Sequence, residues 1–275
     1  MSKNKIIFGS ILLIILGLGL VAASYYTLSQ APESTQTPPE TYQDPTTLME
    51  YIRSLPAQEL NETEIQGILY MREEEKLARD VYTVLYEKWG TMIFSNIAHS
   101  EQIHMDMVKV LIEKYNLTDP VVNDTVGVFT NEHLQELYNE LVTNGSKSLE
   151  DALKVGALIE EVDIIDLDEY ISLTDNEDVK LVYEFLRSGS CNHLRAFVRQ
   201  LENMGIEYTP VLLSQEEYNE IISTTPTRGY GKNNTSTTST TSEVSFANYY
   251  FYAGILSVAG AVGLLGYYAL KRESI

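Results

Sequence analysis

Apolar residues recur every three to four positions through the middle of the chain, which is the period of an α-helix with one buried face. This pattern predicts five helices and very little strand. The helices are expected over residues 62–89, 91–115, 131–142, 148–171 and 177–204. Four of them are long and of matched length, and the short one falls in the central connection. The sequence therefore predicts an all-α fold, an up-and-down four-helix bundle with a short extra helix.

Two uncharged apolar runs flank this region, at residues 6–23 and 249–270. The second run has tyrosines at both borders and the length of a bilayer-spanning helix, so it predicts a transmembrane helix. The first run fits either a signal peptide or a signal anchor. Lysine and arginine lie at the outer ends of both runs, which predicts cytoplasmic tails and a main domain outside the cell membrane.

Composition changes again between the apolar runs and the helices. Residues 27–46 are rich in Pro, Thr and acids, residues 223–247 are rich in Ser and Thr, and both are expected to be stalks or linkers. The predicted order is a signal segment (1–26), a stalk (27–46), the helical domain (47–222), a linker (223–247), a transmembrane helix (248–270) and a tail (271–275). Six glycosylation sequons agree with an extracellular domain: Asn61, Asn116, Asn123, Asn144, Asn233 and Asn234.

The chain is strongly acidic, with 39 Asp and Glu against 19 Lys and Arg and a formal net charge of -20. Such a charge argues against nucleic acid as a partner. Cys191 is the single cysteine, so an intrachain disulfide is excluded. Stability must come from a packed core, with a contribution from metal ions if the chain binds them.

Five polar residues occupy positions that the helical period assigns to the bundle interior: Glu75, Glu101, His104, Glu160 and His193. An ionised carboxylate in an apolar core is costly unless a cation accompanies it, and the predicted buried stripes contain no Lys or Arg. Glu101 and His104 are one helical turn apart, so both point to the same side of their helix. The pattern therefore predicts a metal site.

Four segments, EEEKLARDVYTVLYEKWG, FSNIAHSEQIHMDMV, ALIEEVDIIDL and GSCNHLRAF, resemble the ferritin-like domain-of-unknown-function family 2202 over roughly residues 62–204. The resemblance implies a rubrerythrin-like four-helix bundle that holds two iron or manganese ions. It also implies that Glu75 is a terminal ligand, that Glu101 bridges the metals and that His104 binds one of them. A homodimer is compatible with this family.

The second half of the chain departs from that family pattern. The fourth long helix reads Ser190-Cys191-Asn192-His193 where the ferritin pattern has Glu-x-x-His. Either Glu160 or Glu161 is expected as the ligand from the preceding helix, and Asp163 has a spacing that also points it toward the site. A mononuclear or asymmetric site therefore remains an alternative. Tyr82, seven residues after Glu75, is a candidate hydrogen-bond donor to a ligand or a redox tyrosine, with core packing as the alternative.

Carboxylate and histidine ligands favour Fe or Mn over structural Zn, which usually has Cys and His ligands. The predicted function is that of a membrane-anchored, extracytoplasmic protein that reacts with dioxygen or peroxide, or handles iron. The alternatives are a non-catalytic surface-binding or structural module with a degenerate metal site, and a buffer whose acidic exterior gathers cations. The chain has no Cys-x-x-Cys pair of the rubredoxin kind, so an electron donor would be a separate molecule.

Overall fold

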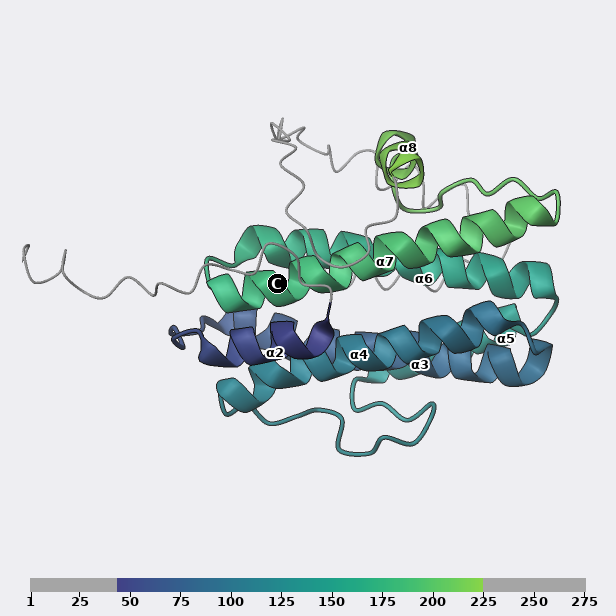
Figure 1. Ribbon diagram of the computed structural model, residues 1–275. Helices are drawn as coiled ribbons and strands as arrows, with labels where there is room; N and C mark the ends of the chain where they lie inside the picture. Colours follow the sequence, from purple (N-terminus) through teal and green to yellow (C-terminus); the bar gives the residue numbers. More distant parts are fainter. Residues whose placement is uncertain (1–43, 225–275) are drawn as a thin grey trace, which may run out of the picture. The chain divides into compact units, whose positions relative to one another are not determined.

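The computed structural model describes residues 44–224, and within this range the protein is helical with no strand (Figure 1). The helices are α2 (Pro45–Ser54), α3 (Glu62–Trp89), α4 (Met92–Lys114), α5 (Glu132–Gly145), α6 (Leu149–Leu173), α7 (Glu177–Asn203) and α8 (Gln215–Ser223). The predicted helical bundle is confirmed. Helices α2 and α8 were not predicted, because each is too short to show a sustained apolar period.

The four long helices form two antiparallel pairs, α3 with α4 and α6 with α7, which lie on one another as two layers (Figure 1). Helices α3 and α6 are neighbours across the layers, and so are α4 and α7. The α3–α6 contact is also antiparallel, since Glu64 near the start of α3 accepts a hydrogen bond from Thr174 after α6, whereas Tyr82 far along α3 reaches Gly156 near the start of α6. All four helices therefore line one interior.

Capping residues fix the ends of these helices. The side chain of Asn61 accepts a hydrogen bond from Glu64 N while Glu64 reaches back to Asn61 N, which forms a capping box at the start of α3. Gly90 ends α3 in the left-handed region at φ 64°, a conformation that glycine adopts without strain. The next helix begins two residues later, so α4 turns straight back along α3.

The connection from α4 to α6 is long because these two helices run in the same direction, so the expected up-and-down order does not hold at this connection. Its segment 116–131 lies against α3 and is held there by charged side chains. Lys76 Nζ donates to Thr125 O, and Asp80 accepts a hydrogen bond from Gly127 N. Lys76 and Asp80 also pair with each other, and both are fully buried. Helix α3 is thus covered by protein on the side away from the bundle interior as well.

Two apolar cores occupy the two ends of the bundle. One contains Leu85, Phe94 and Phe197, and the other contains Ile68, Val108 and Leu186. Each long helix passes from one core to the other, and its metal-ligand candidates come near the crossing. The metal-ligand candidates are therefore enclosed between two apolar regions.

The expected flanking transmembrane helices require a correction. No helix within residues 44–224 combines the length and the apolar composition that a membrane span needs. The long helices instead carry charged residues beside their apolar stripes, as a bundle around a polar centre requires. The fold class is corrected to a helical fold without transmembrane helices in its described part. The apolar runs at 6–23 and 249–270, the signal segment, both linkers and the tail lie outside the described residues, apart from a few residues at the inner ends of the linkers.

Candidate metal centre

Each of the four long helices has at least one polar side chain that points into the same part of the bundle interior. Glu75 comes from α3, Glu101 and His104 from α4, Glu160 from α6 and His193 from α7. The three carboxylates are fully buried, and the two histidines expose 8% or less of their surface. The structure therefore brings together all five residues that the apolar pattern marked as interior.

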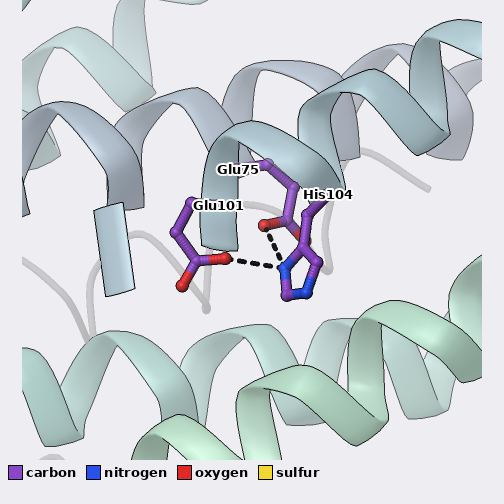
Figure 2. A group of neighbouring side chains, drawn as sticks. All are labelled: Glu75, Glu101 and His104. Carbon is purple, nitrogen blue, oxygen red and sulfur yellow. Dashed lines mark hydrogen bonds and ion pairs between the residues drawn. The ribbon is translucent and has the colours of Figure 1, made fainter. Parts of the chain in front are cut away.

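The first group consists of Glu75, Glu101 and His104 (Figure 2). One ligand atom from each of the three lies within 4.8 Å of the others. His104 Nδ1 is 2.6 Å from Glu101 Oε2 and 3.2 Å from Glu75 Oε2. Figure 2 shows both carboxylates turned toward the same edge of the imidazole ring. This is a three-donor arrangement able to hold one metal ion.

The second group consists of Glu101, Glu160 and His193, again with one ligand atom each within 4.8 Å of the others. His193 Nδ1 is 2.8 Å from Glu101 Oε1 and 3.4 Å from Glu160 Oε2. Glu101 therefore directs one oxygen to each histidine and belongs to both groups. The two imidazole rings stack at 5.5 Å between centroids.

Two hydrogen bonds hold the second group from outside. Tyr82 donates its hydroxyl to Glu160 Oε1 at 2.6 Å. Ser100 Oγ lies 2.9 Å from His193 Nε2, the ring nitrogen that faces away from Glu101. Such outer contacts fix the orientation of a histidine or carboxylate and leave its inner atom for a cation. Tyr82 thus contacts a candidate ligand and does not lie within ligand distance itself.

Several inner atoms of the site have no hydrogen-bond partner among the described residues. They are Glu75 Oε1, both carboxylate oxygens of Glu101, Glu160 Oε2 and His193 Nδ1. The Glu101 oxygens instead lie close to the two histidines, at 2.6 Å from His104 Nδ1 and 2.8 Å from His193 Nδ1. Buried polar groups in proteins are nearly always satisfied, so unsatisfied ones that converge on one point suit a cation or an ordered water there. The donor set passes this test for a metal centre.

The groups of the site shift one another's pKa values. Burial raises the pKa of Glu75 to about 7, although His104 opposes this effect, and burial likewise raises that of Glu160 to about 7 against the opposing effect of His193. Burial by itself would raise the pKa of Glu101, but His193 and His104 outweigh it and hold that pKa below its usual range. The metal-free site therefore has one strongly ionised carboxylate between the two histidines.

The histidine pKa values move in the opposite direction from what burial alone would produce. Burial lowers the pKa of His104, yet Glu75 and Glu101 raise it to about 10. The pKa of His193 is raised well above its usual value in the same way, by Glu101 and Glu160. Protons on the histidines are thus the positive charges that balance the buried carboxylates in the absence of a metal.

Glu161, the alternative to Glu160, lies apart from both groups. Its carboxylate accepts a hydrogen bond from Tyr208 Oη at 2.6 Å and further ones from the backbone N–H groups of residues 211–213. It therefore holds the segment after α7 against α6. Burial raises its pKa even though these hydrogen bonds lower it. Neighbouring positions on a helix point about 100° apart, and here only Glu160 faces the bundle interior.

Two contacts of the site could not be read from the apolar pattern. Ser100 reaches His193 on α7 from α4, and a lone serine beside Glu101 carries no signal of its own. Gly189 leaves room for the ring of His104, because a Cβ atom added at Gly189 would lie 2.4 Å from His104 Nε2. A glycine in the middle of a long helix is a signal of close approach.

The family model described as "Uncharacterized protein domain (DUF2202)" matches residues 64–225 of the chain. The chain belongs to this family. It is 60% identical over 185 residues to "Uncharacterized protein MJ0754" from Methanocaldococcus jannaschii, a match that covers 67% of this chain and 100% of that protein. The crystal structure of "hypothetical protein MJ0754 from Methanococcus jannaschii DSM 2661" is similar with a TM-score of 0.62 and 60% identity, over 63% of this chain and 99% of that one. The predicted membership of DUF2202 is confirmed.

Proposed function

We propose that this DUF2202 protein is a ferritin-like metalloprotein whose buried centre binds two iron or manganese ions. One ion is held by Glu75, Glu101 and His104, and the other by Glu101, Glu160 and His193. The observation that carries the proposal is the position of Glu101, which directs one oxygen into each of two groups while fully shielded from solvent. A carboxylate placed in this way is suited to bridge two cations.

The charges of the site support two divalent ions. Three buried carboxylates carry up to three negative charges, and within the two groups only protonated histidines offset them. A metal ion replaces those protons and leaves the imidazoles neutral, the form in which histidine coordinates. The donor atoms are carboxylate oxygens and imidazole nitrogens without a thiolate, a set suited to iron or manganese.

The surrounding residues restrict what reaches the centre. Apolar cores lie on both sides of it, and Tyr82 and Ser100 keep Glu160 and His193 in fixed orientations. A bound iron or manganese pair would supply electron transfer to a small oxidant. Dioxygen and peroxide are small enough for such an enclosed site. We therefore propose oxidant reduction or ferrous-iron oxidation as the activity, with a separate electron donor.

A non-catalytic helical module with a degenerate site is the second candidate. One observation favours it: α7 supplies a single ligand, because Ser190, one turn before His193, has a hydroxyl that bonds to Leu186 O. A module of this kind needs no stoichiometric metal for its fold. Metal content separates the two candidates.

The test uses the full-length chain, stripped with a chelator and reloaded anaerobically with Fe(II) or Mn(II). Elemental analysis should find two ions per chain. Glu101→Gln should lose both, because it removes the shared ligand, whereas Glu113→Gln on the exposed end of the same helix should keep both. A folded wild-type protein without stoichiometric metal would refute the centre and favour the helical module. Uptake of dioxygen or peroxide only by the loaded protein would then establish reactivity.

A further inference from the structure

The two helical hairpins of the bundle present their ligands in the same order. The α3–α4 hairpin provides Glu75, Glu101 and His104, and the α6–α7 hairpin provides Glu160 and His193. The residue three positions before His193, which corresponds to Glu101, is Ser190. One carboxylate is therefore missing from the α7 side of the centre.

A different carboxylate appears on α6. Asp163 follows Glu160 by three residues, and the corresponding residue after Glu75 on α3 is Ala78. The two hairpins thus differ twice, by the loss of an acid on α7 and by the gain of an acid on α6. Counted over both hairpins, the interior keeps four carboxylates and two histidines.

Asp163 is enclosed and lacks a hydrogen-bond partner. It exposes 1% of its surface, and neither of its carboxylate oxygens has such a partner within residues 44–224. A small cavity of about 10 Å³ lies beside it, but the walls of that cavity, apart from Asp163 and Glu74, are leucine, isoleucine and valine side chains. A cavity of this kind does not provide the hydrogen bonds that a carboxylate requires.

The register of α3 against α6 places Asp163 at the same level along the bundle as Glu75. Tyr82 on α3 bonds to Gly156 O on α6. The two helices are antiparallel. Two turns back from Tyr82 along α3 lies Glu75, and two turns forward from Gly156 along α6 lies Asp163. The pKa of Asp163 agrees with this position, since burial and the charges of Glu74, Glu75, Glu160 and Glu101 all raise it.

We propose that Asp163 is the fourth carboxylate ligand of the centre, and that it binds the ion held by Glu75 and His104. This inference rests on the two-ion centre proposed above. In the metal-free arrangement Asp163 lies outside both ligand groups, so binding requires a rotation of its side chain toward the ion. The bridging carboxylate absent from α7 is thereby replaced by a ligand from α6, which makes the centre asymmetric.

Asp163→Asn in the full-length chain tests this role, with Asp166→Asn as the matched control. Asp166 is an equally buried acid one turn further along α6 and belongs to neither ligand group. Binding of Mn(II) is followed by calorimetry, and folding by the melting temperature of the metal-free protein. Wild type and Asp166→Asn should bind two ions. Asp163→Asn should bind one of the two with an affinity lower by a factor of about ten or more. Asp163→Ser, which adds no new amide, should show the same loss.

The outcomes separate this role from the two-ion centre. If Asp163→Asn and Asp163→Ser are folded and bind two ions with wild-type affinity, Asp163 is a buried structural acid and the inference is wrong, while the centre stands. If wild-type protein binds no ion, the centre itself is wrong, and the role of Asp163 with it. Metal-free Asp163→Asn should melt near wild type, because an amide of similar size replaces a carboxyl group whose oxygens make no hydrogen bond within residues 44–224.

Discussion

Gly189 on α7 lies so close to the imidazole of His104 on α4 that a Cβ atom at position 189 would be 2.4 Å from Nε2. Real carbon atoms do not approach that closely, so the ring takes the space that a side chain at this position would fill. Phe185, one turn earlier on α7, meets the same ring edge-on with centroids 5.7 Å apart. The orientation of His104 is therefore set by the partner helix across the bundle.

We expect Gly189→Ala to weaken metal binding in the group that contains His104. The new methyl group must displace the ring, and loss of an orienting contact typically costs about 10 to 100-fold in metal affinity. Gly67→Ala is the control, because a Cβ atom added at this helical glycine would also meet a ring, at 2.8 Å from Tyr170 Cδ1, away from the centre. Calorimetry with Mn(II) on both variants checks this. Equal metal affinities in the two variants would contradict the role assigned to Gly189.

Tyr82→Phe should reduce metal affinity in the second group and lower stability slightly. The substitution removes the hydroxyl that donates to Glu160 Oε1 at 2.6 Å and keeps the ring that packs on Phe197. The loss of one buried hydrogen bond costs about 1 kcal/mol in the free energy of unfolding, and somewhat more when the acceptor is charged. Tyr183→Phe is matched, since the Tyr183 hydroxyl is buried without a hydrogen-bond partner in the described range. Urea unfolding should give Tyr183→Phe a stability close to that of wild type, and Mn(II) titration should give it a similar metal affinity.

Glu160→Gln and Glu161→Gln should differ sharply although the residues are adjacent. Glu160→Gln should lose the ion shared with His193, whereas Glu161→Gln should keep two ions per chain. Glu161 instead anchors residues 211–213, so its substitution should speed amide hydrogen exchange in that segment. Elemental analysis and hydrogen exchange on both variants measure the two effects. Loss of metal from Glu161→Gln with an undisturbed segment would reverse the assignment.

The helical period predicts the interior positions of Glu75, Glu101, His104, Glu160 and His193 well, because residues three to four apart share a helix face. The same period does not predict which side of α6 Glu161 faces. Helix α6 is buried on two sides, by the bundle and by the segment after α7, so an acid beside Glu160 can be buried without facing the centre. Which side each acid faces depends on contacts that are distant in sequence.

Lys76 and Asp80 show a second limit of the pattern. Both look like surface residues, and both are fully buried because segment 116–131 covers that face of α3. The path of a long connection follows from the directions of α4 and α6, which a periodic pattern does not contain. The expectation of flanking transmembrane helices rested on composition at the chain ends and has no counterpart among the helices of residues 44–224.

The metal-free protein should lose stability as pH rises from 5 to 9. Glu75 and Glu160 have folded pKa values of about 7 against 4.5 ordinarily, so they hold their protons more tightly in the folded chain, and their contribution falls between about pH 4.5 and 7. His104, at about 10 against 6.5, and His193, also raised, act in the same direction between about pH 6.5 and 10. Glu101, with a lowered pKa, contributes above pH 4.5 and loses its contribution only in acid.

Metal should reverse this dependence, since the ions replace the protons and bind better as pH rises. Melting temperatures of chelator-treated and Mn(II)-loaded protein at pH 5, 7 and 9 measure the effect. The gap between the two forms should widen with pH. A metal-free melting temperature that rises steadily from pH 5 to 9 would show that the site does not hold the protons assigned to it.

Lys76→Met should destabilise the protein by about 3 kcal/mol or more, because it leaves the buried charge of Asp80 without its closest partner. Lys76 Nζ also donates to Thr125 O at 3.0 Å and lies 4.5 Å from the centre of the Phe129 ring. The substitution should therefore loosen segment 116–131 as well as weaken the fold. Urea unfolding gives the first effect, and amide hydrogen exchange in that segment gives the second.

Lys154→Met is the matched control for Lys76→Met. Lys154 pairs with Glu150 one turn away on α6, but both side chains are more than 40% exposed. An exposed pair of this kind contributes about 0.2 to 1 kcal/mol, because water and salt screen it. A large difference between the two lysine variants, with faster exchange confined to segment 116–131 in Lys76→Met, is the expected result. Equal small effects would mean that Arg79, which also pairs with Asp80, suffices to hold the connection on α3.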